Sequence, residues 1–113
     1  IGLLGFSLGG HLCLRLRRKA KILVEYFAPI LDGIGPVGTL THAQIHHGEA
    51  DNFPGTGFSN AKSIKEELER EKASTELFAY PGAGHGFIGN DQANSDARTQ
   101  SKKATLTFFE THL

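Results

Sequence analysis

IGLLGFSLGG, residues 1–10, is the stretch that decides the fold, because an apolar run leads directly into the motif Gly-x-Ser-x-Gly. A short apolar run ended by glycine predicts a buried strand over residues 1–6. Helical spacing then predicts a helix over residues 8–20, whose sheet-facing stripe would be Leu8, Leu12, Leu16 and Ala20. The alternation of Leu12, Leu14 and Leu16 would also suit a strand, so the helix prediction depends partly on its context. Ser7 therefore lies at a tight strand-to-helix turn, in which side chains at positions 5 and 9 are expected to collide.

The rest of the chain alternates between strand and helix signals. Strands are predicted over residues 21–28, 43–47 and 76–80. Two further helices are predicted from apolar stripes: Ala61, Ile64 and Leu68 in one, and Ala97, Ser101, Ala104 and Phe108 in the other, with Asn94 or Ser95 as its N-cap. Strands that alternate with helices imply an α/β fold of about four parallel strands with flanking helices.

The composition is that of a globular chain without a dominant charge. The 113 residues carry 12 Lys plus Arg and 12 Asp plus Glu, which gives no reason to expect nucleic acid or an anionic membrane as a partner. No apolar run approaches the roughly 18 residues that span a bilayer, and the first residues lack a basic signal-peptide region. Cys13 is the only cysteine, so no internal disulfide forms and a reducing, cytoplasmic location is expected.

Three candidate catalytic residues each follow a predicted strand. In parallel sheets, ligands bind at the loops that leave the carboxyl ends of the strands. Ser7 follows the first predicted strand, Asp51 the third and His85 the fourth. A serine nucleophile needs a base and an orienting acid, and the order serine, acid, histidine suits a strand–turn–helix nucleophile. Glu49 is the rival acid, and Asp51 is preferred because it lies deeper in the loop.

LLGFSLGG, IHHGEADNFP and YPGAGHGF together resemble the dienelactone hydrolase family of the α/β-hydrolase superfamily. The resemblance covers residues 1–113 but corresponds to the family's C-terminal half, so it implies one three-layer α/β-hydrolase domain without its N-terminal half. It also implies carboxymethylenebutenolidase-like hydrolysis of small esters or lactones, with no cofactor. In these roles Ser7 attacks the carbonyl, His85 accepts the proton and Asp51 orients the imidazole. The N–H of Leu8 would bind the oxyanion, with a second donor from the other half.

The sequence departs from this family's pattern at two points. The family's nucleophile is usually Cys in Gly-x-Cys-x-Gly-Gly, whereas this chain has Ser7. Lactone-cleaving members hold a substrate carboxylate with arginines, one of them shortly after the histidine, but residues 86–90 contain no arginine. A neutral or weakly polar ester or lactone is therefore the expected substrate. Phe53 and Phe87, beside the loops, are expected to line a shallow, open pocket.

A polar cluster next to the candidate acid is not expected to bind a metal; it consists of His42, His46, His47, Glu49 and Asp51. Adjacent strand residues point to opposite faces, so His46 and His47 are badly placed to share one ion. Cys13 is expected to be a small buried hydrophobe that faces the sheet with Leu12 and Leu16.

A second interpretation of the chain is not enzymatic. Four parallel strands would leave the first, residues 1–6, as an exposed apolar edge. The chain would then be a truncated fragment of a hydrolase or an interaction module, and it would self-associate through that edge. On either interpretation, residues 1–113 alone are expected to be inactive even if they fold.

Overall fold

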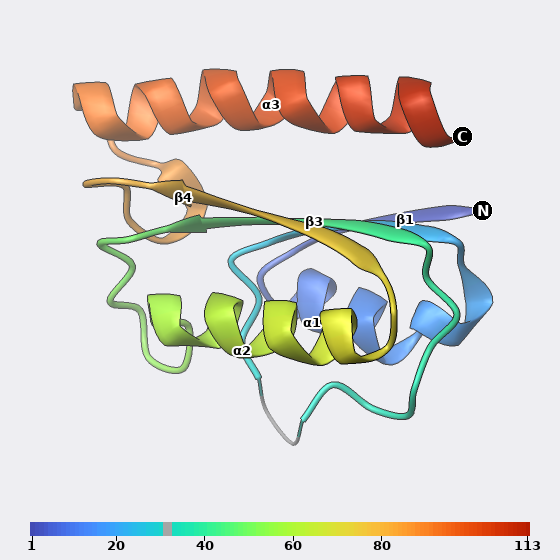
Figure 1. Ribbon diagram of the computed structural model, residues 1–113. Helices are drawn as coiled ribbons and strands as arrows, with labels where there is room; N and C mark the ends of the chain where they lie inside the picture. Colours follow the sequence, from blue (N-terminus) through green and yellow to red (C-terminus); the bar gives the residue numbers. More distant parts are fainter. Residues whose placement is uncertain (31–32) are drawn as a thin grey trace.

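The computed structural model describes residues 1–30 and 33–113, which form a four-stranded parallel sheet between helices. The strands are β1 (Gly2–Phe6), β2 (Ile22–Tyr26), β3 (His42–Gly48) and β4 (Ser74–Tyr80), hydrogen-bonded in the order β1-β2-β3-β4. The α-helices of the described chain are α1 (Leu8–Arg15), α2 (Phe58–Arg70) and α3 (Gln92–His112). Figure 1 shows α1 and α2 on one face of the sheet and α3 on the other. The predicted fold class is confirmed, and the predicted strand ends are shifted by two residues at most.

Each face of the sheet has its own apolar layer, because successive strand residues point to opposite faces. One layer lies under α1 and α2 and includes Leu14, Leu23, Ile45, Ile64 and Leu68. The other lies under α3 and includes Ile22, Val24, Tyr26, Ala97 and Phe108. All five residues of β2 are buried, as expected for a strand covered on both faces. The predicted inner face of α2 is confirmed, because Ala61, Ile64 and Leu68 are its buried residues.

Helix α1 is shorter than predicted and turns a different face to the sheet. It ends at Arg15, and a short 3₁₀ turn, Arg17–Lys19, follows it. The predicted inner stripe is wrong at its three leucines, since Leu8, Leu12 and Leu16 are each more than half exposed. The buried residues are Gly10, His11 and Leu14. Ala20 is buried as predicted, and Cys13 is half-buried against the core without Leu12 or Leu16 beside it.

Gly10 explains why α1 packs on this face. A methyl group at Gly10 would lie 3.1 Å from the Cβ of Ala28 and 3.4 Å from the Cβ of Glu25. Glycine therefore lets the helix backbone approach the strand closely. His11 supports the same orientation, because its Nδ1 lies 3.1 Å from the carbonyl oxygen of Pro29.

A buried ion pair joins the segment after α1 to the end of α2. Arg17 is fully buried, and its guanidinium donates to the two carboxylate oxygens of Glu71 at 2.9 and 2.5 Å. It also donates to the carbonyls of Leu14, Ile34 and Gly35. These partners use the full donor set of the guanidinium, which is the condition for burying such a charge.

Helix α3 is capped by Asp91, so the predicted caps Asn94 and Ser95 are wrong. The Asp91 carboxylate accepts from the backbone N–H of Asn94. The Asn94 side chain is buried, donates to Asp91 at 2.8 Å and accepts from the Gly84 N–H at 3.0 Å. The predicted inner face is correct, with Ala97, Ser101 and Phe108 buried and Ala104 half-buried. Helix α3 therefore also supports the loop that carries His85.

Strand β1 lies at one edge of the sheet, as predicted. Leu4 and Phe6 on this strand are 45% and 52% exposed. Helix α1, which carries the exposed Leu8 and Leu12, packs against β1 from the opposite face of the sheet (Figure 1). Apolar side chains are therefore uncovered on both sides of the β1 edge.

Candidate active site

The side chains of Ser7, Asp51 and His85 meet at the carboxyl ends of the strands. Ser7 directly follows β1, Asp51 lies in the loop after β3, and His85 lies in the loop after β4. The strands are parallel and in register, so these loops leave the sheet at the same edge. The three residues that sequence analysis singled out are therefore brought together.

The backbone turns sharply at Ser7. Its φ of 53° and ψ of −120° lie outside the conformations that a serine readily adopts. A side chain at Gly5 would overlap the carbonyl oxygen of Gly9 and lie 2.8 Å from Cys13 Sγ. Among residues 1–30 and 33–113, apart from the neighbouring backbone of α1 itself, no atom lies within 4 Å of a Cβ built on Gly9. The predicted steric need for glycine is therefore correct at position 5 and wrong at position 9.

A continuous hydrogen-bonded path joins the three side chains. The Ser7 hydroxyl donates to Nε2 of His85 at 3.0 Å, and Nδ1–H of His85 donates to Oδ2 of Asp51 at 2.9 Å. This tautomer is assigned because a carboxylate only accepts. Asp51 is 7% exposed, whereas Glu49 is exposed, so the structure puts Asp51 rather than its rival against His85. Asp51 can thus hold the imidazole with Nε2 directed at Ser7.

The carboxylate of Asp51 has donors on both oxygens. Oδ1 accepts from the backbone N–H of Phe53 at 3.1 Å and from the hydroxyl of Thr56 at 2.8 Å. Nε2 of His47 lies 3.2 Å from Oδ2, the oxygen that His85 also contacts. Sequence analysis missed Thr56 and treated His47 only as a poor metal ligand. The position of His47 at the end of a strand, four residues before the acid, was the available signal.

The loops that carry Asp51 and His85 are fastened to each other. The N–H of Ala50 donates to the carbonyl of Ala83 at 3.0 Å, and that of Glu49 to the carbonyl of Tyr80 at 3.0 Å. A side chain at Gly48 would overlap the carbonyl oxygen of Ala83. Glycine at position 48 therefore permits the close approach that lets the acid reach the histidine.

Aromatic rings surround the imidazole of His85. The ring of Phe53 stacks on it with centroids 4.8 Å apart, and that of Phe27 lies at 5.1 Å. Phe53 is 56% exposed. Sequence analysis missed Phe27, although it follows β2 at the same edge of the sheet. Phe27 has a positive φ of 42°, and its ring lies against that of His85.

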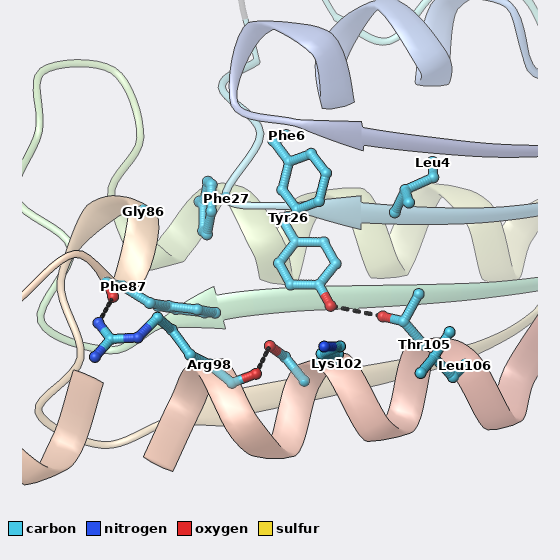
Figure 2. A pocket seen from close by; sticks show the side chains of 11 residues that line it. Leu4, Phe6, Tyr26, Phe27, Gly86, Phe87, Arg98, Lys102, Thr105 and Leu106 are labelled. Carbon is cyan, nitrogen blue, oxygen red and sulfur yellow. Dashed lines mark hydrogen bonds between the residues drawn. The ribbon is translucent and has the colours of Figure 1, made fainter. Parts of the chain in front are cut away.

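An apolar cavity of about 330 Å³ lies beside these rings, between β1, β2 and α3. Figure 2 shows Phe6, Tyr26 and Phe87 along its wall, with Arg98 and Lys102 on the helix side. Phe87 is almost fully buried and lines this cavity, whereas Phe53, the other predicted substrate contact, is not among its lining residues. Arg98 donates to the carbonyls of Phe87 and Gly89, so its guanidinium holds the segment after His85.

His46 lies in the packing layer of the opposite face from His47. Its ring stacks on Tyr26 at 4.6 Å and on Phe78 at 4.8 Å, and its Nδ1 lies 2.8 Å from the Tyr80 hydroxyl. Burial lowers the pKa of His46 to about 3. Within residues 1–30 and 33–113, no three His, Cys, Asp or Glu side chains are grouped as metal ligands. In the same residues no helix has the length and apolar character needed to cross a membrane.

Comparison with known proteins agrees with this geometry. The chain matches the dienelactone hydrolase family over residues 1–113. It is similar to a dienelactone hydrolase-like promiscuous phosphotriesterase from metagenomic libraries, with 19% identity and a TM-score of 0.68 over 97% of this chain and 51% of that one. It is also similar to Thermogutta terrifontis esterase 2 phosphoramylated by tabun, with 18% identity and a TM-score of 0.69 over 96% of this chain and 55% of that one. A third similar structure is MGS-M1, an α/β hydrolase from a Medee basin deep-sea metagenome library, with 23% identity and a TM-score of 0.62 over 82% of this chain and 43% of that one.

These likenesses show that the fold is that of the α/β hydrolases. Within that class, the chain belongs to the dienelactone hydrolase family. A search of curated proteins returns no match. The chain spans about half the length of the three structures described, between 43% and 55%.

Proposed function

We propose that the protein carrying this sequence is a serine hydrolase of the dienelactone hydrolase type, which cleaves small carboxylic esters or lactones. The observation that carries this proposal is the path from the Ser7 hydroxyl through His85 to Asp51, with links of 3.0 and 2.9 Å. Membership of the family supports it. The chain covers only about half the length of the similar structures. We therefore propose this activity for the full protein encoded by the gene, called the encoded protein below, and not for residues 1–113 alone. A cytoplasmic location remains a prediction.

The proposed reaction begins when Ser7 Oγ attacks the ester carbonyl carbon and its proton passes to Nε2 of His85. The tetrahedral intermediate collapses as His85 returns that proton to the leaving alcohol, which leaves an acyl group on Ser7. Water then attacks the acyl carbon, His85 accepts the water's proton, and the intermediate releases the carboxylic acid and the Ser7 hydroxyl. Asp51 stays ionised throughout and stabilises the imidazolium that forms twice.

Negative charge on the substrate oxygen would be stabilised at the start of α1. Leu8 is the first residue of that helix, and N–H groups in a first turn have no acceptor within the helix. The positive end of the helix dipole lies at the same place. We therefore assign one oxyanion donor to the Leu8 N–H and expect a second from outside residues 1–113.

The proposed substrate is neutral or weakly polar. Residues 86–90 contain no arginine, and Arg98 is engaged with two backbone carbonyls. The exposed ring of Phe53 beside His85 would contact the substrate, while buried Phe87 supports the wall. Comparing p-nitrophenyl butyrate with p-nitrophenyl hemisuccinate tests this assignment. The neutral ester should have the higher kcat/KM, and the opposite order would contradict it.

The roles of the three residues are tested by substitution in the protein as its gene encodes it. Ser7→Ala and His85→Ala should abolish turnover of p-nitrophenyl butyrate to a similar extent, because triad residues act as a unit. Asp51→Asn should lower kcat by about 10⁴ if the acid acts as in serine proteases. Ser59→Ala, on the exposed side of α2, is the matched control. A larger loss from Glu49→Gln than from Asp51→Asn would assign the acid to Glu49.

The second candidate function is a non-catalytic interaction module. The exposed apolar side chains beside β1, including Leu4, Phe6 and Leu12, favour it. Under this alternative, the encoded protein binds a partner through that edge and shows no turnover that depends on Ser7.

A further inference from the structure

His47 is a buried histidine that the proposed reaction does not use. It is fully buried at the end of β3. Its Nε2 lies 2.6 Å from the carbonyl oxygen of Thr56 and 3.2 Å from Oδ2 of Asp51. The Nδ1 atom is buried and has no hydrogen-bond partner among the residues that the structure describes. Nε2 of His47 therefore lies close both to the Asp51 carboxylate and to the backbone of Thr56, in the loop that follows Asp51.

The surroundings assign the tautomer of this ring. The carbonyl of Thr56 and the carboxylate of Asp51 only accept, so the proton lies on Nε2. Nδ1 is then unprotonated. A proton on Nδ1 would instead be a buried N–H donor without an acceptor, which costs free energy. Burial lowers the pKa of His47, and His85 acts in the same direction, against the raising effect of Thr56 and Asp51. His47 is therefore a neutral donor.

Thr56 completes a closed arrangement around the acid. Its carbonyl accepts from His47, and its hydroxyl donates to Oδ1 of Asp51 at 2.8 Å. It is 2% exposed, so the arrangement is shielded from water. The Phe53 N–H also donates to Oδ1. If the carboxylate rotated away from His85, Oδ1 would lose its two hydrogen bonds and Oδ2 would lose its contact with His47.

We propose that His47, together with Thr56, is a positioning residue that holds the Asp51 carboxylate in the orientation that His85 requires. The inference rests on the proposed function, because it assigns these two residues a part in the same reaction. Neither side chain touches the substrate. Both act on the imidazole through Asp51, in the way that residues behind a reacting group fix its geometry.

Paired variants of the encoded protein separate donation from packing. His47→Gln puts an amide N–H near the place of the imidazole Nε2–H, whereas His47→Leu removes the donor. Thr56→Ser keeps the hydroxyl, whereas Thr56→Val removes it at similar volume. His42→Leu is the matched control, because His42 lies at the other end of β3, and there its ring stacks on His112.

The inference predicts a selective loss of kcat for p-nitrophenyl butyrate. His47→Leu and Thr56→Val should each lower kcat by about tenfold to a hundredfold. Thr56→Val removes a hydroxyl donor from the buried carboxylate, and His47→Leu removes the Nε2–H group, which donates to the Thr56 carbonyl and whose nitrogen lies 3.2 Å from Oδ2. KM should stay within about threefold, because no substrate contact is lost. His47→Gln and Thr56→Ser should recover most of the loss. Equal losses in the Leu and Gln variants, or a loss below threefold in His47→Leu, would overturn the inference.

A spectroscopic readout separates this inference from the proposed function. In ¹⁵N–¹H spectra of the ring nitrogens, His47 should carry its proton on Nε2 alone, and the Nδ1 proton of His85 should be shifted downfield by Asp51. Both signals should persist in Ser7→Ala, and the His85 signal should broaden in His47→Leu. A proton on Nδ1 of His47, or an unchanged His85 signal in His47→Leu, would overturn the inference. Turnover that survives in Ser7→Ala would instead overturn the proposed function.

Discussion

Gly5 is the residue on which the backbone conformation at Ser7 most directly depends. Its missing side chain leaves room for the carbonyl of Gly9 and for Cys13 Sγ, 2.8 Å from the position of a Cβ. We predict that Gly5→Ala destabilises the protein by about 1–3 kcal/mol, as overpacking does, and lowers ester turnover. Gly9→Ala is the control, because its Cβ would meet open space and alanine favours a helix by about 1 kcal/mol. Urea unfolding of both variants checks this, and equal destabilisation would contradict it.

Glu25 gives the protein a pH-dependent stability. The side chain is fully buried in β2, where Oε2 accepts from the Ala28 N–H at 3.0 Å and Oε1 has no hydrogen-bond partner within residues 1–30 and 33–113. Burial raises the pKa of this carboxyl from 4.5 to about 8, although the Ala28 N–H opposes the shift. Since the folded-state pKa lies above the unfolded value, the stability present below pH 4.5 is lost as the pH rises toward about 8.

The loss should amount to about 1.4 kcal/mol for each pH unit in that window. Glu25→Gln keeps the acceptor for Ala28 but does not ionise, so its free energy of unfolding should lack this slope. Denaturant unfolding of both proteins at pH 5, 6.5 and 8 measures the difference. Parallel pH profiles would show that Glu25 does not control this dependence.

At the scale of elements, the ion pair of Arg17 and Glu71 joins the turn that follows α1 to the end of α2. Arg17→Met leaves the Glu71 carboxylate without its ion-pair partner, with the Gly38 N–H still donating to it, so this change should destabilise the fold by about 3–5 kcal/mol. Arg17→Met combined with Glu71→Leu should recover part of that loss, because no charge is then buried. Lys65→Met is the control, since the Lys65–Glu69 pair is exposed and such pairs contribute about 0–1 kcal/mol. A double-mutant cycle with coupling below 1 kcal/mol would refute this account.

The sequence predicted the elements that depend on local pattern. The order of strands and helices, the turn at Ser7 and the loop positions of Asp51 and His85 all follow from apolar runs and glycines. The face of α1 was mispredicted because Gly10, rather than the leucines, sets how closely the helix approaches β2. His47 and Thr56 were missed because their contacts with Asp51 depend on how the loop closes.

At the scale of the whole molecule, the β1 edge determines how residues 1–113 behave alone. An edge strand offers unpaired N–H and C=O groups, and here Leu4, Phe6 and Leu12 beside it are about half exposed. We predict that the isolated segment self-associates through this edge. It should hydrolyse p-nitrophenyl butyrate no faster than its Ser7→Ala form, because a single oxyanion donor leaves kcat about 10²–10³ lower.

Size-exclusion chromatography of the purified segment, with assays at equal concentration, checks this expectation. Leu12→Glu should shift the profile toward monomer, whereas Val37→Glu, at an exposed loop position, should not. A soluble monomer whose turnover depends on Ser7 would contradict the role given to the edge.

The central claim, that Ser7 is a nucleophile activated by His85 and Asp51, is tested most directly by covalent labelling. A fluorophosphonate probe reacts with an activated serine hydroxyl and should modify the encoded protein once, on the peptide that contains Ser7. Labelling should disappear in Ser7→Ala and His85→Ala and persist in Ser59→Ala. Labelling that survives Ser7→Ala, or that maps by mass spectrometry to another serine, would contradict the claim.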